Sequence, residues 1–175
     1  VVLLARGPQA HRQLSQALTT GGIHKTYLAL VWGHPRPRVG SWTFPLAPDR
    51  RDRRRMRVEA SGKPAHSDYR VLATPPHASL LALTPRTGRT HQLRVHLAAA
   101  GHAIVGDDLY GGPRHRGVRD LRLRQALDPP HLLLHAWRLR LSAQRGAPEL
   151  VIAAPLPAAF AAALAALGIE QNLLQ

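Results

Sequence analysis

Runs of apolar residues predict most of the strands in this chain. Residues 25–32 read KTYLALVW, a nearly continuous apolar and aromatic run that is typical of a buried strand, and Gly33 and Pro35 end it. Further runs predict strands at 67–73, 79–84 and 150–154, and a long strand at 131–141. A Thr-Pro-Pro-His turn joins the second strand to the third, and the last two strands are close enough in sequence to pair.

Apolar or small residues at helical spacing predict three helices, at 8–18, 91–100 and 155–168. Pro8 lies in the first turn of the first helix, and Thr90 is the expected N-cap of the second. Residues 34–65 are expected to be mainly loop, and 114–124 to be either the start of a helix or a loop. Strands outnumber helices and occur in adjacent runs, which predicts an α+β fold with a mostly antiparallel, mixed sheet and flanking helices. With no internal repeat and no break in composition, we expect a single domain over residues 1–175.

The net charge of +14 changes this picture, because 24 Lys and Arg face only ten Asp and Glu. A positive field of this size favours a polyanionic partner, with nucleic acid first. Arginine makes up 22 of the 24 cations, and it binds phosphate in a bidentate manner and stacks on bases. The alternative is that the arginines only reflect the nucleotide composition of the source genome.

Several classes of site are excluded by composition and spacing. The chain has no cysteine, so disulfides, thiolate zinc sites and cysteine nucleophiles are ruled out. It has no G-x-S-x-G elbow and no glycine-rich phosphate loop. His91 and His96 are five residues apart, which does not place two metal ligands on one helical face. No apolar run approaches the ~20 residues of a membrane span. We expect no metal and no cofactor.

The segment 85–96, PRTGRTHQLRVH, carries the densest candidate chemistry. It leads from a strand through a tight turn into a helix, where Arg89, Thr90, His91 and Gln92 together form a donor-rich pocket for an anion. Arg94 follows one turn into the helix, and a partly buried arginine requires a carboxylate or phosphate partner. The alternative is an ordinary solvated start of an amphipathic helix.

Four blocks of the sequence resemble the RluA-type pseudouridine synthases. They are KTYLALVWGHP (25–35), SGKPAHSDYRVL (61–72), THQLRVHLAAAGHAIVGDDLYGG (90–112) and HLLLHAWRLRL (131–141), in the order and with the approximate separations of the family. The first 18 residues resemble the stretch that follows the family's first motif, His-Arg-Leu-Asp with Thr-Ser-Gly a few residues on. The resemblance implies a pseudouridine synthase-like catalytic domain that detaches a flipped uracil, rotates it and rejoins it through carbon.

The nucleophile of the family is the aspartate of that first motif, and none of this chain's seven aspartates lies in such a context. We therefore expect Val1 to be a truncation point, and the chain as written not to isomerise uridine. One alternative is a catalytically inactive RNA-binding module derived from the same fold. A weaker one is a basic, ribosome-associated protein without a uridine pocket.

The resemblance also implies roles for individual residues. Tyr27 would pack against the flipped uracil and assist proton transfer, and Arg94 would form an ion pair with the missing aspartate. One of the leucines 132–134 would form the floor of the uracil pocket, and Leu134 is taken as the candidate. Asp107 and Tyr110 would fix a loop. RNA contacts around the flipped base would come from Arg89, Thr90, His91 and Gln92.

The same resemblance implies ribosomal or transfer RNA as the partner, no membrane association, a monomer and a cytoplasmic location. The arginines within 50–55 and 114–124 would attract RNA at long range; their alternative is a basic loop that provides solubility. The reaction is redox-neutral acid–base chemistry, which requires neither cofactor nor metal.

Overall fold

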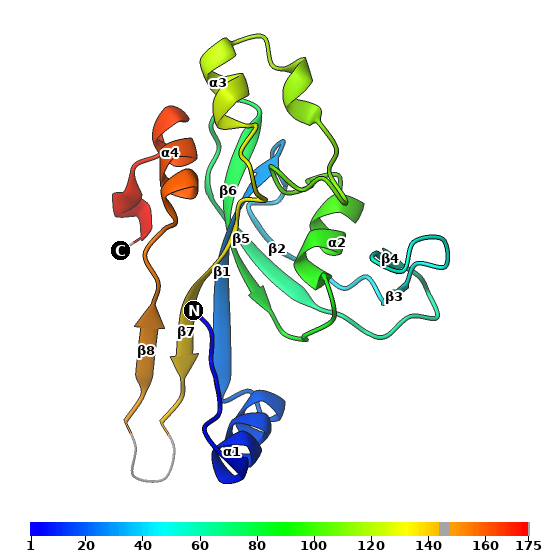
Figure 1. Ribbon diagram of the computed structural model, residues 1–175, viewed down its shortest axis with the longest axis vertical. Coiled ribbons are helices and arrows are strands. Elements are labelled where there is room, and N and C mark those ends of the chain that lie inside the picture. The colour runs from blue at the N-terminus through cyan, green and yellow to red at the C-terminus, as the bar shows by residue number, and fades with distance from the viewer. Residues whose placement is uncertain (144–147, 175) are drawn as a thin grey trace.

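A six-stranded sheet in the order β2-β5-β6-β1-β7-β8 forms the centre of the computed structural model, which describes residues 1–143 and 148–174 (Figure 1). Every strand pairing in it is antiparallel, so the expected α+β class is confirmed while the expected mixed character is wrong. The strands are β1 (Ile23–Trp32), β2 (Val39–Trp42), β5 (Ser67–Ala73), β6 (Ala78–Pro85), β7 (Leu134–Leu141) and β8 (Leu150–Ala153).

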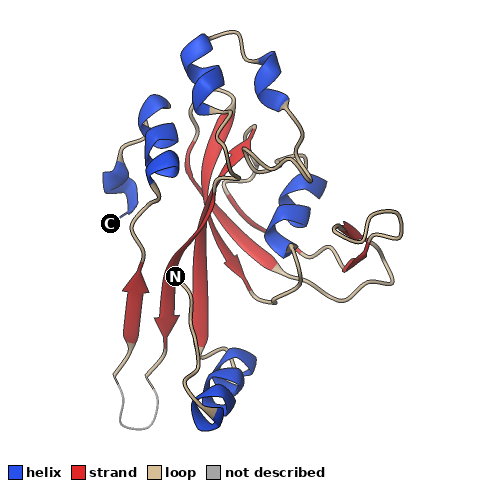
Figure 2. Cartoon of the chain, viewed as in Figure 1, coloured by secondary structure: helices blue, strands red, loops and turns tan. Residues whose placement is uncertain are grey.

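In the part of the chain that the structure describes, four α-helices and two short 3-10 helices lie around this sheet (Figure 2). They are α1 (Pro8–Thr19), α2 (Gln92–Ala99), η1 (Arg114–Gly117), α3 (Leu121–Ala126), α4 (Ala158–Ala166) and η2 (Gln171–Leu174). A separate hairpin is formed by β3 (Leu46–Pro48) and β4 (Met56–Val58). No helix in the described part of the chain is long and apolar enough to cross a membrane.

Most predicted elements are confirmed, and the differences concern short or charged segments. Residues 34–65 contain three short strands, β2, β3 and β4, where mainly loop was expected. Residues 114–124 contain η1 and the start of α3, whose N-cap Asp120 accepts the Leu123 amide hydrogen. The predicted Thr90 cap is wrong: the N-cap of α2 is His91, in the left-handed conformation with φ of 52°.

Strand β1 is buried on both faces, which explains its nearly continuous apolar sequence. Leu28, Leu30 and Trp32 pack into a cluster that includes Phe160 and Leu164 of α4. The alternate residues Ala29 and Val31 pack on the other face, against Leu93 and Leu97 of α2. The sheet is thus the middle layer between α2 on one side and α3 and α4 on the other.

Tyr27 lies where the register of β1 against β7 shifts, between Thr26 and Tyr27. Its partners are Ala136 of β7 and Leu83 of β6. Such a bulge re-aims a side chain locally, and bulges are over-represented beside active sites. The ring packs with the cluster on the α2 face, so Tyr27 and the segment preceding α2 share one side of the sheet.

The β3–β4 hairpin extends away from the sheet, at the right of Figure 1. Its base is held by a small apolar cluster in which Leu46, Ala65 and Val95 are buried. A Cβ atom on Gly62 would lie 2.6 Å from the Leu46 carbonyl carbon, so only glycine fits this close approach. The hairpin is therefore anchored at its base, while its tip, residues 49–55, carries a dense group of arginines.

Candidate active site

A cavity of about 530 Å³ lies between β1, the turn after β6 and the start of α2. Six of the seven predicted site residues line it, and only Thr90, which is exposed, does not. The six are Tyr27, Arg89, His91, Gln92, Arg94 and Leu134. Residues that are up to 107 positions apart in sequence thus meet at one hollow of a size typical of small-molecule sites.

The guanidinium of Arg94 is paired with Asp107. Nε donates to Oδ2 at 2.8 Å and Nη2 to Oδ1 at 2.7 Å, a bidentate pair in which the carboxylate is fully buried. These hydrogen bonds raise the pKa of Arg94, so it remains charged. The expectation that its carboxylate lies outside this chain is therefore wrong for this edge of the guanidinium. Nη1 makes no hydrogen bond to any described residue and remains available to a second anion.

Asp107 also fixes its own loop, as the family resemblance implied. Its Oδ1 accepts the backbone N–H groups of Leu109 and Tyr110, both at 3.1 Å. The same carboxylate therefore orders the loop and aims Arg94. Sequence reasoning missed this pairing, although the requirement of Arg94 for an acid was the signal that could have found it.

Gln92 is buried, and its amide is fully engaged within the protein. Nε2 donates to the His66 carbonyl oxygen and to Ser67 Oγ, both at 2.9 Å. Oε1 accepts from Thr87 Oγ1 at 2.7 Å and from the Arg89 amide at 3.0 Å. These four bonds use the whole capacity of the side chain. Gln92 thus clamps the turn to β5, and its amide has no free group for the predicted RNA contact.

His91 lines the cavity with a neutral imidazole. Burial lowers the pKa of His91, and the positive charge of Arg94 lowers it further, while Asp107 acts in the opposite direction. Its left-handed backbone is uncommon for a residue other than glycine, and such strain concentrates at functional sites. Arg89 is exposed and donates from Nε to the Pro64 carbonyl oxygen at 3.1 Å, which leaves its terminal nitrogens at the rim.

Tyr27 and Leu134 provide the apolar wall. Tyr27 is half-buried, and burial raises the pKa of its phenol, so the hydroxyl is protonated at neutral pH. Leu134 packs beside it on the α2 face, whereas Leu133 belongs to the cluster on the opposite face. Leu132 packs on the same face as Leu134, but of the three leucines 132–134 it is Leu134, at the start of β7, that lines the cavity.

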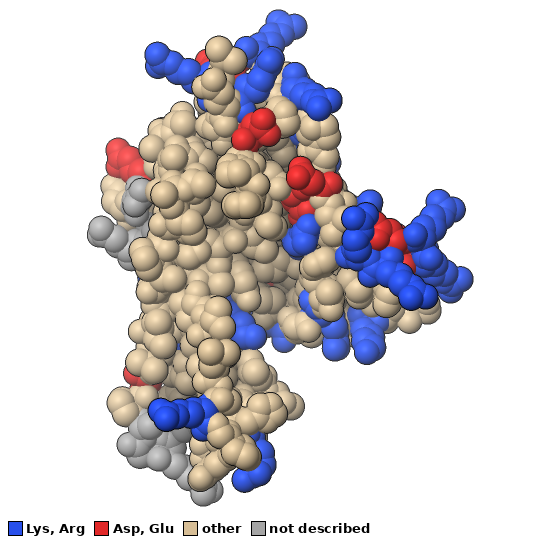
Figure 3. Space-filling view, in the orientation of Figure 1, with Lys and Arg blue, Asp and Glu red and all other residues tan. Residues whose placement is uncertain are grey.

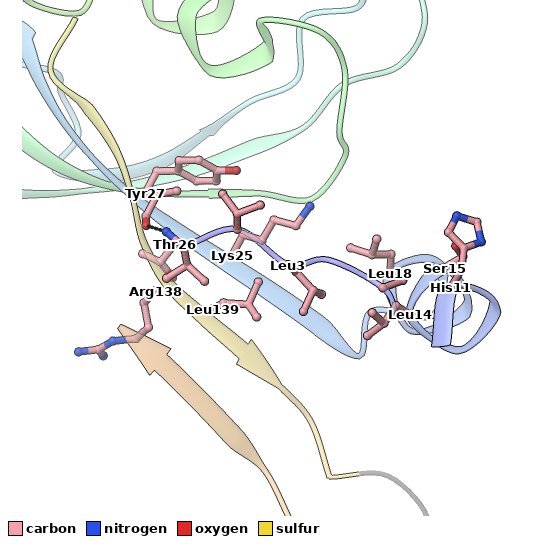
Figure 4. A pocket seen from close by; sticks show the side chains of 14 residues that line it. Leu3, His11, Leu14, Ser15, Leu18, Lys25, Thr26, Tyr27, Arg138 and Leu139 are labelled. Atoms are coloured by element: carbon pink, nitrogen blue, oxygen red, sulfur yellow. Dashed lines mark hydrogen bonds between the residues drawn. The ribbon is translucent and has the colours of Figure 1, made fainter. Parts of the chain in front are cut away.

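A second cavity of about 330 Å³ adjoins the first and shares Leu18, Lys25 and Tyr27 with it (Figure 4). Residues 1–5 run along its edge, and the Val1 nitrogen lies 2.6 Å from the carbonyl oxygen of Ala136, the strand partner of Tyr27. Val1 therefore lies beside the backbone of Tyr27. Among residues 1–143 and 148–174, no three His, Asp or Glu side chains are grouped as a metal site would require.

Positive side chains gather over the β3–β4 hairpin and over the α3 end of the molecule in Figure 3. Arg50, Arg51 and Arg53 of the hairpin are exposed. Exposed arginines of this kind bind polyanions through charge.

The sequence profile of the RNA pseudouridylate synthase family matches residues 1–99, and the chain belongs to this family. It is 41% identical over 90% of its length to an uncharacterized RNA pseudouridine synthase of Chloroflexus aurantiacus, of which it covers 46%. It is 37% identical over 81% of its length to the dual-specificity RNA pseudouridine synthase RluA of Escherichia coli, of which it covers 61%.

The fold agrees with this assignment. The structure of human RNA pseudouridylate synthase domain containing 4 superposes with a TM-score of 0.71 at 28% identity, covering 93% of this chain and 69% of that one. The chain spans about half to three fifths of the length of the curated relatives named above. It therefore represents the family's catalytic fold over part of the length of those proteins.

Proposed function

We propose that the protein isomerises specific uridines of RNA to pseudouridine, with the cavity that contains Tyr27 and Arg94 as its uridine site. One observation carries the proposal: six residues chosen from the sequence converge on a single hollow. The family membership and the exposed arginines of the hairpin and of the α3 end support it. Ribosomal or transfer RNA as the substrate, the monomeric state and the cytoplasmic location stay predictions.

In this proposal, each residue has a defined physical task. A uridine flipped out of the RNA stack would lie against the Tyr27 ring and Leu134, since base flipping needs an apolar surface that replaces stacking. Arg94 would hold the nucleophilic aspartate through Nη1, lowering the pKa of that carboxyl by about 1–3 units and aiming it. The protonated Tyr27 hydroxyl would serve proton transfer at the base carbon.

The nucleophile would come from the segment that precedes Val1 in the complete protein. The position of Val1 beside the backbone of Tyr27 supports this, because a residue a few positions earlier would reach the edge of the cavity. Exposed arginines of the hairpin and the α3 end would contact phosphates outside the cavity.

The test uses Arg94→Lys in the complete protein. Lysine keeps the positive charge beside Asp107 but loses the bidentate fork and Nη1. We expect pseudouridine formation, measured by mass spectrometry on transfer and ribosomal RNA transcripts, to fall by about 10²-fold because the carboxylate is misplaced. RNA affinity should stay within about twofold, since the net charge is unchanged. Arg140→Lys is the matched control, because Arg140 is an exposed arginine of β7 that pairs with Glu149.

Full activity in Arg94→Lys would show that the ion-pair assignment is wrong. A wild-type complete protein that binds RNA but forms no pseudouridine in either RNA would instead support the inactive RNA-binding module. Mapping pseudouridines in cellular RNA with and without the gene would then identify the modified uridine.

A further inference from the structure

Tyr110 connects the basic hairpin to the cavity. It follows Asp107 in the ordered loop, and its ring packs against the apolar cluster at the base of the hairpin. The guanidinium carbon of Arg94 lies 4.9 Å from the ring centroid, and that of Arg55 lies 5.3 Å from it. One aromatic ring thus contacts a cation of the cavity and a cation of the hairpin.

The hydroxyl of Tyr110 joins the same two regions by hydrogen bonds. It accepts the backbone N–H of Met56 in β4 at 2.8 Å, and its oxygen lies 3.0 Å from Nδ1 of His91. The hydroxyl keeps its one hydrogen for donation, and Nδ1 of His91 is an acceptor within hydrogen-bond distance of it. An imidazole nitrogen accepts a hydrogen bond only when it carries no proton, so donation by Tyr110 would place the single proton of the neutral ring on Nε2.

Nε2 of His91 has no hydrogen-bond partner among the described residues, and it is not one of their buried, unpartnered polar atoms. In that tautomer it is an accessible N–H donor on a residue that lines the cavity. The charged groups that face the ring are Arg94 and Asp107, and their mutual bidentate pairing leaves the imidazole without an anion of its own.

We propose that Tyr110 is a positioning residue that holds His91 as the Nε2–H tautomer, so that His91 presents a fixed neutral donor to an acceptor oxygen of the nucleotide in the cavity. The inference rests on the proposed function and adds to it a specificity-determining donor. Since the Met56 N–H belongs to β4, the orientation of this donor also depends on the docked position of the hairpin.

The first test is spectroscopic and does not depend on activity. In the wild-type complete protein labelled with ¹⁵N-histidine, His91 should show an unprotonated Nδ1 and a protonated Nε2 near neutral pH, with the signal assigned by its loss in His91→Asn. In Tyr110→Phe, both tautomers should become populated. A protonated Nδ1 in the wild type, or an unchanged tautomer in Tyr110→Phe, would overturn the proposal, and the wild-type result decides even if the variant does not fold.

The second test is kinetic. Tyr110→Phe keeps the ring over Arg94 and removes the hydrogen bonds to Met56 and His91, so we expect a fall in kcat of about threefold to tenfold. Tyr69→Phe is the matched control, since its buried ring stacks on Trp42 and its hydroxyl donates to the Pro37 carbonyl oxygen. That variant should also lose stability, from one hydrogen bond where Tyr110→Phe loses two, and it should keep the wild-type kcat. Equal kcat in the two variants would contradict a positioning role.

A double variant shows whether Tyr110 acts through His91. His91→Asn suits this purpose because asparagine tolerates the left-handed backbone at this position. If Tyr110 acts through the imidazole, Tyr110→Phe should lower kcat no further in the His91→Asn background. If the double variant instead shows the product of the two single-variant losses in kcat, Tyr110 does not act through His91.

The source of the acceptor oxygen is found by comparing RNAs. An RNA with an abasic target site keeps its phosphates but lacks the carbonyl groups of the base. A loss of affinity in Tyr110→Phe for the abasic RNA identifies an oxygen of the sugar–phosphate backbone, and a loss confined to intact RNA identifies a base carbonyl; no loss for either contradicts the donor role. If the wild type forms no pseudouridine, the proposed function fails while the tautomer measurement still decides the role of Tyr110.

Discussion

The turn and loop around the cavity and the β3–β4 hairpin are both rich in polar and charged groups, but they use them differently. Around the cavity, the polar groups of Gln92 and the Arg94–Asp107 pair have fixed, largely buried partners. On the hairpin, Arg54 holds the pKa of Asp52 at about 2, yet this pair lies at the surface, where ion pairs add little stability.

The two regions therefore have different roles: one positions groups precisely, and the other attracts a polyanion. Buried, bidentate contacts fix a guanidinium to a fraction of an ångström, which chemistry requires. Exposed arginines on a small hairpin have no fixed direction, but they attract phosphates over a distance of about 8 Å at physiological salt. One region should therefore be sensitive to single atoms, and the other only to the sum of its charges.

The largest expected effect comes from Asp107→Ala. It removes a buried acceptor of four hydrogen bonds and leaves Arg94 largely buried without its partner. We expect the free energy of unfolding, measured by urea denaturation, to fall by about 3–5 kcal/mol. Asp108→Ala, an exposed neighbour, is the control and should change little. Similar losses of stability in the two variants would mean that the hydrogen bonds of Asp107 do not stabilise the cavity region.

An intermediate effect is expected when Arg50, Arg51 and Arg53 are together replaced by Gln. If each contacts one phosphate, the slope of log affinity against log salt for a uridine-containing RNA stem–loop should become shallower by about 2–3. The free energy of unfolding should stay the same. Replacing Arg6, Arg12 and Arg140 by Gln removes equal charge away from the hairpin. If the two triple variants have equal slopes, only net charge matters, and the hairpin is no special surface.

The smallest expected effect is a change in how stability depends on pH, and it arises from fully or partly buried histidines at α2. His96 is fully buried; burial lowers its pKa, the hydrogen bond to the Phe44 carbonyl oxygen opposes this, and nearby His66 lowers it further. A depressed pKa in the folded state means that the unfolded chain binds the proton first, so stability falls as pH drops below about 6.5. His91 acts in the same direction.

We expect the free energy of unfolding to decrease between about pH 7.5 and about pH 5.5, and to do so less in His96→Gln. His131→Gln, at an exposed histidine, should keep the wild-type dependence. An unchanged pH dependence in His96→Gln would show that this histidine takes up its proton equally in both states.

Long apolar elements were predictable from sequence, because burial on one or both faces imposes a period that the sequence records. β1 and β6 illustrate this, with bounds within two residues of those expected. The three-residue strands β3 and β4 were not predictable, since their arginine-rich surroundings indicate loop and their pairing depends on a tertiary anchor at Gly62.

The sequence predicted which residues form the candidate site, but not which hydrogen-bond and ion-pair partners they have. The need of Arg94 for a carboxylate follows from elementary electrostatics, but Asp107 lies 13 residues away in a loop whose position depends on the fold. Gln92 was assigned to RNA because its type suits such contacts, whereas its burial is a property of the folded turn. The left-handed backbone of His91 could not be predicted, because no adjacent glycine in the sequence indicates it.

The Arg94–Asp107 pair also affects the distribution of charge around the cavity. As a pair it is close to neutral, so it adds little net charge to the lining of the cavity, whereas Lys25 and Arg89, which line the same cavity, have no acidic partner among the described residues. A phosphate of the ligand would therefore be attracted mainly by Lys25 and Arg89, while Arg94 has only Nη1 left for one further anion.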